Sequence, residues 1–515
     1  MSAPSMRYLP LLLPFVLATG CERHQGAEEA PKVVVEVPEG PVPGPKDLLK
    51  SVVRISTTQQ EWNQGQPWEK LSPGKRRSLG AIVGKDKVLT TAEMAADATY
   101  IELESPDGKR LVSAKVIAVD YEANLALLGV ESEADAKFFE GTNPLEIAAR
   151  PKPGDTLDIV QVEENGTPLV TTGGIQSIDV ISNFLPGQFF LTYEVKASMQ
   201  SAANSFSLPV LRDGKLAGIL TSYDSKDQLS DVMATDIVER FVREAADGDY
   251  AGFPSLGIST SRTEDINFRA WLKLTDDVGG LYVSTVRVGS AAEKAGVKKG
   301  DVIVSIDGHD IDRLGYFDDP HYGRLYWSHL VRGAKSSGDK VLLEIIRDGQ
   351  PVKVEAVLDR RDEKDQLVPG YTFGKAPSYL VKGGLVFQEL TRPLLESFGE
   401  EWQSRAPLNL LDVYENPQKY ESRGHRIVLL AGVIATPATV GYEPLRNLIV
   451  TKVNGKEIKD MKSLVEAFEA PGDGGMHAIE FDEEKFTVHL DEAISTAVDG
   501  QLVQRGLAPL SRTED

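Results

Sequence analysis

The sequence contains a single cysteine, Cys21, in 515 residues. One thiol excludes an internal disulfide framework, a cysteine-rich zinc site and a Cys-ligated iron–sulfur cluster. Basic residues are outnumbered, because 77 acidic side chains against 56 basic ones give a formal net charge of -21. That charge repels phosphate backbones, so nucleic-acid binding is not expected. With 41% hydrophobic and 26% charged residues, the chain has an average globular composition, and its length predicts two to four domains.

The N-terminal residues account for the cysteine. Arg7 precedes an apolar run over residues 8–18, which is too short to span a membrane but has the plan of a secretory signal. The stretch Ala18-Thr19-Gly20-Cys21 resembles a bacterial lipobox. We therefore expect a signal peptide over 1–20, a lipid on Cys21, a flexible tether over 21–47 and a bacterial cell-envelope location. An ordinary cleaved signal peptide or an uncleaved N-terminal anchor is the alternative.

Residues 48–247 are rich in short β-branched and apolar runs separated by turn residues. The pairs Asp107-Gly108 and Asp213-Gly214 lie between such runs and predict hairpins. This pattern predicts an all-β domain of barrel type. A closing helix is expected near its end, with one apolar face made of Val232, Met233, Ile237, Val238, Phe241 and Val242.

The remainder contains a weak internal repeat, since residues 303–311 align without gaps on residues 450–458. In each copy a strand enters an Asp-Gly or Asn-Gly turn and leaves toward an apolar residue. Helical stretches follow at 328–332 and 461–468. Two α+β modules of similar plan are therefore predicted, over 252–360 and 372–510, the second carrying an extra run over residues 391–418.

Residues 289–301, a run of small residues with a glycine stop, closely resemble the signature of a PDZ domain. An all-β domain, a linking helix and two such modules are the plan of the HtrA/Deg family of envelope serine proteases. Residues 78–92, 114–128 and 204–209 are similar to the family stretches that carry the catalytic histidine, aspartate and serine. The resemblance implies a multidomain protein, a trypsin-like double β-barrel followed by two α+β PDZ domains, that forms homo-oligomers or mixed oligomers with HtrA-like proteins.

The catalytic residues depart from the family pattern. Glu93 stands where the resemblance places the general base histidine, and Asn124 stands where it places the orienting aspartate. The nucleophile position falls on Phe206 without a gap, or on Ser205 with a shift of one residue. The glycines that normally shape this loop are absent, which weakens any oxyanion hole.

The distribution of histidines leads to the same conclusion without an alignment. The chain has seven, at positions 24, 309, 321, 329, 425, 477 and 489, so none lies within residues 48–246. A Ser-His dyad inside the β domain is therefore excluded, and the carboxylate of Glu93 is a poor base for a serine. We predict a pseudoprotease. The alternatives are an endopeptidase with an unusual site and a regulatory partner of an active homologue.

Peptide binding does not require the catalytic residues. PDZ domains add an extended peptide as a strand and receive its C-terminal carboxylate in a loop of backbone N–H groups. The resemblance places that loop at Leu256-Gly257-Ile258 in the first module, with Tyr379-Leu380-Val381 as a weaker counterpart in the second. The expected partners are polypeptide C-termini or unfolded proteins, bound by a scaffold, adaptor or chaperone in envelope protein quality control.

Neither a metal nor a cofactor is expected. Asp318, Asp319, His321 and His329 match no zinc spacing and are interpreted as a solvated loop. The pairs Gly279-Gly280 and Gly383-Gly384 lack the Lys-Ser/Thr of a phosphate loop and are interpreted as entries into strands.

Overall fold

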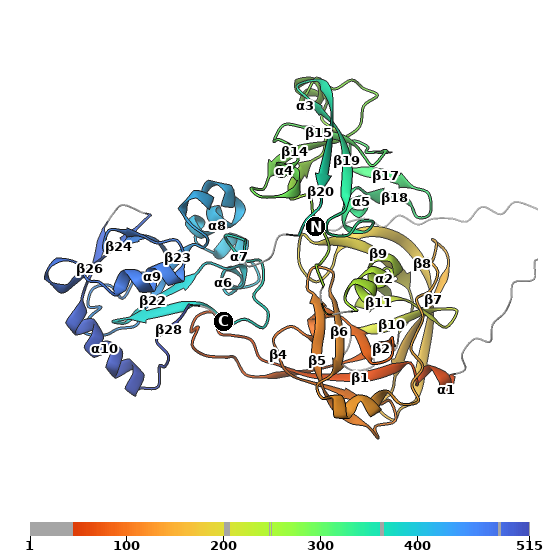
Figure 1. Cartoon of the computed structure of the whole chain (residues 1–515), viewed down its shortest axis with the longest axis horizontal. Helices are drawn as coiled ribbons and strands as arrows, with labels where there is room; N and C mark the ends of the chain where they lie inside the picture. Colours follow the sequence, from red (N-terminus) through yellow and green to blue (C-terminus); the bar gives the residue numbers. More distant parts are fainter. Residues whose placement is uncertain are drawn as a thin grey trace, which may run out of the picture. The chain divides into compact units, whose positions relative to one another are not determined.

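The computed structural model describes residues 45–199, 207–246, 248, 250–360, 365–482 and 486–513 (Figure 1). Cys21, Ser205 and Phe206, which the sequence analysis singled out, lie outside these residues. Within the described part of the chain, no helix has the length and apolar character needed to cross a membrane.

The first domain begins with a closed antiparallel barrel in the strand order β1-β2-β3-β6-β5-β4. Its strands turn alternate side chains inward, where Ile55, Leu103 and Leu128 are fully buried. Closure pairs both edges of the sheet, so no edge is left for aggregation. The elements are α1 (Pro45–Leu48), β1 (Val52–Gln59), β2 (Gly74–Val83), β3 (Lys87–Thr90), the 3-10 helix η1 (Ala92–Met94), β4 (Ala98–Glu104), β5 (Leu111–Asp120), β6 (Leu125–Val130) and η2 (Glu133–Phe139).

A second closed barrel follows in the order β10-β11-β12-β9-β8-β7. The predicted hairpin at Asp213-Gly214 is confirmed, with φ of 52° and 74° joining β10 to β11. One detail of the predicted helix is wrong, because Val232 and Met233 end a strand and the helix starts two residues later. The elements are β7 (Thr156–Val162), β8 (Pro168–Ser182), β9 (Phe189–Lys196), β10 (Leu208–Arg212), β11 (Lys215–Asp224), β12 (Leu229–Met233) and α2 (Thr235–Glu244).

The first α+β module has the sheet order β13-β14-β15-β19-β20. Strand β16 pairs with β15, and β17 with β18 forms a separate hairpin. The elements are β13 (Ile258–Ser261), α3 (Ile266–Trp271), β14 (Leu281–Val286), α4 (Ala291–Lys294), β15 (Val302–Ile306), β16 (His309–Asp310), β17 (Tyr316–Asp319), β18 (Gly323–Tyr326), α5 (Ser328–Arg332), β19 (Lys340–Arg347) and β20 (Gln350–Val357).

The second module has a longer sheet in the order β27-β26-β24-β23-β22-β21-β28, with β25 paired to β24. The extra run predicted within it contains helices α6 to α8. The elements are β21 (Tyr379–Lys382), β22 (Leu385–Glu389), α6 (Arg392–Glu396), α7 (Trp402–Arg405), α8 (Leu408–Glu415), η4 (Pro417–Lys419), η5 (Glu421–Arg423), β23 (Val428–Val433), β24 (Leu448–Val453), β25 (Lys456–Glu457), α9 (Met461–Phe468), η6 (Asp473–Gly475), β26 (Met476–Phe481), β27 (Thr487–Asp491), α10 (Glu492–Gln504) and β28 (Ser511–Arg512).

The predicted internal repeat is confirmed by two equivalent hairpins. Asp307 and Gly308 have φ of 47° and 82° between β15 and β16, and Asn454 and Gly455 have 52° and 75° between β24 and β25. Two consecutive positive φ angles make a type I′ turn, whose twist matches that of the flanking strands. The chain is thus a double β-barrel followed by two α+β modules, as predicted.

Candidate functional site

Glu93 and Asn124 are brought together by the pairing of β3 with β6. Thr90 of β3 lies opposite Ala126 of β6, so η1, which follows β3, lies beside the turn that precedes β6. The backbone N–H of Glu93 donates to Oδ1 of Asn124 at 3.1 Å. The two positions predicted for the base and its orienting partner are therefore in direct contact.

Asn124 has a backbone conformation that restricts the residue types it accepts. Its φ is 52°, in the left-handed region, and only 1% of its surface is exposed. Asparagine tolerates this region better than most residues, because its short polar side chain bonds locally. The observed role of Asn124 is to fix the backbone at residue 93.

The side chain of Glu93 is paired with a residue that the sequence analysis did not identify. Its carboxylate accepts a hydrogen bond from the guanidinium of Arg76 on β2. Gln59 on β1 holds the backbone of the same residue, donating from Nε2 to the Glu93 carbonyl at 2.6 Å. Glu93 is thus engaged by a cation and presents no neutral proton acceptor of the imidazole kind.

The end of the predicted nucleophile loop reaches the same place from the second barrel. Ser207, directly before β10, is 5% exposed, and its Oγ lies 3.0 Å from Oγ1 of Thr90. The N–H of Thr91 donates to Ser207 Oγ at 3.3 Å, and the N–H of Leu79 donates to the Ser207 carbonyl at 3.2 Å. Three segments predicted to carry the site therefore converge, although Ala203 to Phe206 lie outside the described residues.

The turn that carries Asn124 is anchored through Asp120. This carboxylate is fully buried and accepts from the N–H of Ala123 at 2.8 Å. It also accepts from the Tyr250 hydroxyl at 3.0 Å and from Arg360 at 2.8 Å. A buried carboxylate with three donors makes a rigid support for the turn.

The predicted carboxylate loop of the first module has a geometry that only glycine fits. Gly257 has φ of 73°, and a Cβ there would lie 2.3 Å from Cβ of Ser290. Its N–H donates to Oγ of Ser255 at 3.1 Å. The loop leads directly into β13, the edge strand, whose second edge pairs with no strand among the described residues.

Ser255 at the start of this loop and Arg287, which directly follows β14 and contacts the loop, were not predicted as part of the site. The N–H of Arg287 donates to the Gly257 carbonyl at 2.9 Å, and its Nη2 lies 3.5 Å from Ser255 Oγ. The loop therefore combines backbone donors, a hydroxyl and a guanidinium, which is the chemistry that recognises a carboxylate. Neither residue follows a periodic pattern that would have identified it from sequence.

The equivalent edge of the second module is occupied by the chain itself. Strand β22 holds the place that β13 holds in the first module, but β21 pairs with it, with Tyr379 opposite Gln388. The C-terminal strand β28 then pairs with β21, with Arg512 opposite Tyr379. The suggestion of a carboxylate loop at Tyr379-Leu380-Val381 is therefore wrong, since these buried residues lie within a strand.

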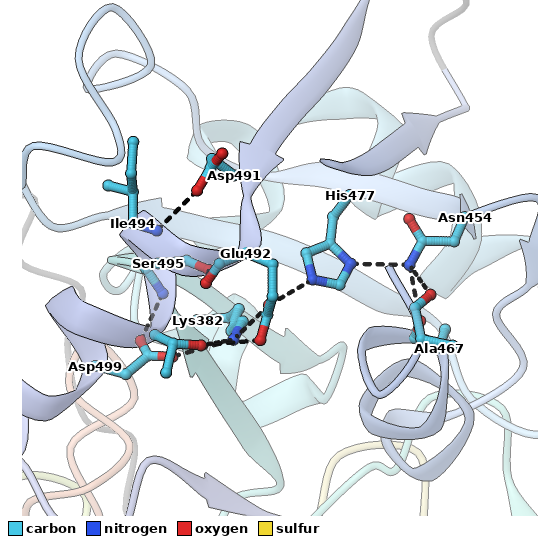
Figure 2. A network of polar contacts seen from close by, with 12 residues as sticks. Lys382, Asn454, Ala467, His477, Asp491, Glu492, Ile494, Ser495 and Asp499 are labelled. Atoms are coloured by element: carbon cyan, nitrogen blue, oxygen red, sulfur yellow. Dashed lines mark hydrogen bonds and ion pairs between the residues drawn. The ribbon is translucent and has the colours of Figure 1, made fainter. Parts of the chain in front are cut away.

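A polar network ties helix α10 to this added strand (Figure 2). Lys382 at the end of β21 donates to Glu492 at 2.9 Å and lies 3.4 Å from Asp499. Buried His477 accepts from Asn454 at Nδ1 and donates from Nε2 to Glu492 at 2.7 Å. Burial alone would raise the pKa of Glu492, but bonds from His477, Lys382 and Thr496 lower it to about 2.

The interpretation of Asp318, Asp319, His321 and His329 as one solvated loop is wrong, because Asp318 and Asp319 belong to strand β17 and His329 lies buried in helix α5. His321 Nε2 lies 3.1 Å from the carbonyl oxygen of Pro151, and His329 is buried, which lowers its pKa. No cluster of His, Cys, Asp and Glu with metal-binding geometry occurs among the described residues. Gly280 and Gly384 directly precede β14 and β22, in agreement with the strand entries predicted for the two Gly-Gly pairs.

Two family models match the C-terminal half, and each is described as a PDZ domain. One covers residues 254–358 and the other residues 368–513. Protease Do-like 2, chloroplastic, of Arabidopsis thaliana is 29% identical over 458 residues, which is 87% of this chain and 72% of that protein. Putative protease Do-like 3, mitochondrial, of the same plant is 26% identical over 424 residues, covering 82% and 72%.

Among solved structures, an HtrA-type protease AlgW with decapeptide is similar at 19% identity and a TM-score of 0.46, over 61% of this chain and 96% of that one. The sequence relatives align with more than four fifths of the chain, and the two PDZ matches coincide with the two α+β modules described above. The chain is therefore similar to the HtrA/Do-like proteases over most of its length, and its fold is a trypsin-type double barrel followed by two PDZ domains.

Proposed function

We propose that this chain is a non-proteolytic HtrA-type protein that binds exposed polypeptide C-termini through its first PDZ domain. It would act as a scaffold, adaptor or chaperone in envelope protein quality control. The observation that carries the proposal is the pairing of Glu93 with Arg76 at the position of the general base. A serine nucleophile needs a neighbouring acceptor for its proton, and a carboxylate engaged by a guanidinium is a weak one.

The first PDZ domain supports the binding half of the proposal. Its edge strand β13 is open along the described chain, and the loop of Leu256, Gly257 and Ile258 lies at the start of that strand. A carboxylate placed there would meet backbone N–H groups and the guanidinium of Arg287. Hydrogen bonds to charged groups contribute about 1.5–3 kcal/mol each to binding, before the entropic cost of ordering the peptide is subtracted.

The second PDZ domain contributes differently. Because β21 and β28 extend its sheet beyond β22, a peptide cannot add to β22 without displacing them. The network of Lys382, Glu492 and Asp499 holds β21 in place. We assign peptide binding to the first domain alone.

Membrane attachment completes the proposal. A lipid on Cys21 would tether the mature chain to a bacterial envelope membrane, and residues 22–47 would separate it from the barrels. The support is the lipobox-like stretch that ends at Cys21. The relatives' own names place them in plant organelles, so the location of this chain rests on its N-terminal sequence.

Fluorescence anisotropy with the full-length protein tests the binding directly. Two labelled peptides of one sequence with an aliphatic last residue are compared, one with a free C-terminal acid and the other amidated. We expect the free acid to bind more tightly by at least about tenfold, the equivalent of one lost charge-assisted hydrogen bond. Equal affinity for the two forms would remove the carboxylate loop from the proposal.

A further inference from the structure

The segment between β20 of the first PDZ domain and β21 of the second carries two aromatic side chains that pack on the barrels. Phe373 lies against Tyr121, with ring centroids 4.7 Å apart, and stacks on Phe184 at 5.4 Å with planes at 22°. Tyr371 meets Tyr121 at 5.4 Å and stacks on Phe373 at 5.6 Å. We call residues 371–374 the strap, and we call Tyr121 and Phe184, which receive its rings, the aromatic seat.

The two seat residues belong to different barrels. Tyr121 directly follows β5 of the first barrel and lies three residues before Asn124, whereas Phe184 lies between β8 and β9 of the second barrel. Because the Phe373 ring contacts both, the two loops lie close together and the barrels form the seat jointly. The strap therefore packs beside the turn that carries one of the candidate-site residues.

Local sequence folds the strap into a turn that carries Phe373. The N–H of Lys375 donates to the Thr372 carbonyl at 3.1 Å, and Gly374 has a φ of 70°. A turn with a positive φ at its third residue favours glycine there, because glycine adopts this conformation without strain. The N–H of Gly374 also donates to Oδ1 of Asp97 at 2.9 Å. The turn and this hydrogen bond fix the backbone on which Phe373 is carried.

The seat adjoins a cavity that the strap does not fill. This cavity has a volume of about 820 Å³, and its walls include the apolar side chains of Leu71, Phe184 and Leu185 together with Tyr371 and Phe373. Charged residues of both signs complete the lining. Ligand sites in proteins are concave, with mainly apolar walls and a few polar groups. The surface under the strap is therefore part of a larger concave site.

The strap can leave its seat without unfolding a domain. Residues 371–374 belong to no helix or strand, and the rings of Tyr371 and Phe373 are only partly buried. Segments with few buried contacts open at a low cost in free energy. Because the strap is joined to the chain at both ends, it competes with an external ligand at an effective concentration in about the millimolar range.

We propose that the aromatic seat is a latent binding site for unfolded polypeptides, which takes a segment with two aromatic side chains separated by one residue. The stretch Tyr371-Thr372-Phe373 is the chain's own occupant of this site and shows which chemistry fits it. A foreign segment binds only when the strap is released, so the strap lowers the apparent affinity as an intramolecular competitor. The site needs no free C-terminus and therefore goes beyond the proposed function.

Fluorescence anisotropy with a labelled peptide that copies residues 368–377 and has an amidated C-terminus tests the seat apart from the carboxylate loop. Full-length protein with Tyr371→Ser and Phe373→Ser, which empties the seat, should bind this peptide at least about tenfold more tightly than wild type. The same peptide with serine at both aromatic positions should bind the double variant about tenfold more weakly, because two buried rings are lost. A peptide with one Tyr-x-Phe unit in a Gly/Ser background should bind the double variant as the copied peptide does.

Substitutions in the seat supply the matched control. Phe184→Ala, introduced into the double variant, should lower the affinity for the copied peptide by about tenfold. Phe189→Ala should leave it unchanged, because Phe189 is a 41% exposed ring at the first position of β9 that makes no ring contact with the strap among the described residues. Circular dichroism verifies that both variants remain folded, as expected for side chains that are not part of a buried core.

Each outcome decides one claim. Equal affinity of wild type and the double variant for the copied peptide, or affinity retained in Phe184→Ala, would overturn the seat as a binding site. Binding of the copied peptide without binding of the Tyr-x-Phe peptide in the Gly/Ser background would overturn the assignment to foreign polypeptides. Neither result bears on the carboxylate loop, because these peptides have no C-terminal acid.

Discussion

The backbone N–H of Glu93 donates to the side-chain oxygen of Asn124 at 3.1 Å, across the paired strands β3 and β6. The contact joins the two positions at which the family resemblance places the base and its orienting partner. It involves the backbone of one residue and leaves its carboxylate to Arg76. The backbone of residue 93 is therefore held in place by Asn124. Its side chain, however, is a carboxylate and not the imidazole of a general base.

Substitutions at Asn124 should separate its structural role from a catalytic one. Asn124→Ala loses the acceptor for the partly buried N–H of Glu93 and keeps a strained φ of 52°, so the first barrel should lose about 2–3 kcal/mol of stability. Asn124→Asp keeps an acceptor and should lose less than about 1 kcal/mol. Amide hydrogen exchange in β3 and β6 measures the stability of this barrel separately from that of the other domains. Equal losses of stability in Asn124→Ala and Asn124→Asp would show that the hydrogen bond between Glu93 and residue 124 does not stabilise the barrel.

Gly257→Ala should destroy the carboxylate loop of the first PDZ domain. The added Cβ would lie 2.3 Å from Cβ of Ser290, at a φ of 73°. Gly289→Ala is a matched control, because Gly289 has φ of 74° but a Cβ added there would have no atom within 4 Å. Both variants carry similar backbone strain, of about 1 kcal/mol, and only Gly257→Ala should abolish the preference for a free acid over an amide in anisotropy. Similar losses in both variants would attribute the effect to strain alone.

The second PDZ domain should lose stability in acid through Glu492. Its pKa is lowered from 4.5 to about 2, so its bonds with His477 and Lys382 contribute fully above pH 4.5. That contribution should fall as the pH drops from about 4.5 to 2, because the unfolded chain takes up its proton first. Hydrogen exchange at β21 between pH 5 and pH 3 would follow the loss. In Glu492→Gln, the part of the pH dependence of stability that comes from Glu492 should vanish. An unchanged pH dependence would show that other carboxyl groups cause it.

Cys21→Ser should release the protein from membranes. A thioether-linked diacylglycerol holds by two acyl chains, whereas the acidic chain offers no electrostatic second signal toward an anionic surface. Fractionation of cells that express wild type or variant tests this. A variant that stays with the membrane after a salt wash would indicate an uncleaved N-terminal anchor.

Much of the architecture follows from local sequence. The turns at Asp307-Gly308 and Asn454-Gly455 need positive φ at both positions, and this requirement identified the two repeated hairpins. The contact between Glu93 and Asn124 agrees with the family resemblance, which assigned both positions to one site.

Other features depend on contacts that leave no periodic trace. Arg76 on β2 pairs with Glu93 in η1, which follows the neighbouring strand β3, and this is one exposed ion pair among many charged residues. The two-residue strand β28 is too short to show alternation, so its pairing with β21 could not be predicted. Val232 and Met233 fit a helical face and a strand equally well, and their pairing with β9 decides for the strand.

The measurement that tests the central claim most directly is fluorophosphonate labelling of the full-length protein at neutral pH, with Ser205→Ala as the reference. We predict that wild type is labelled no faster than Ser205→Ala, because no histidine lies in the β domain and Arg76 engages the carboxylate of Glu93. Glu93→His combined with Asn124→Asp should also remain unlabelled, since the loop at Phe206 lacks the usual glycines. Labelling of wild type that disappears in Ser205→Ala would show a working nucleophile and contradict the proposal that this chain is a pseudoprotease.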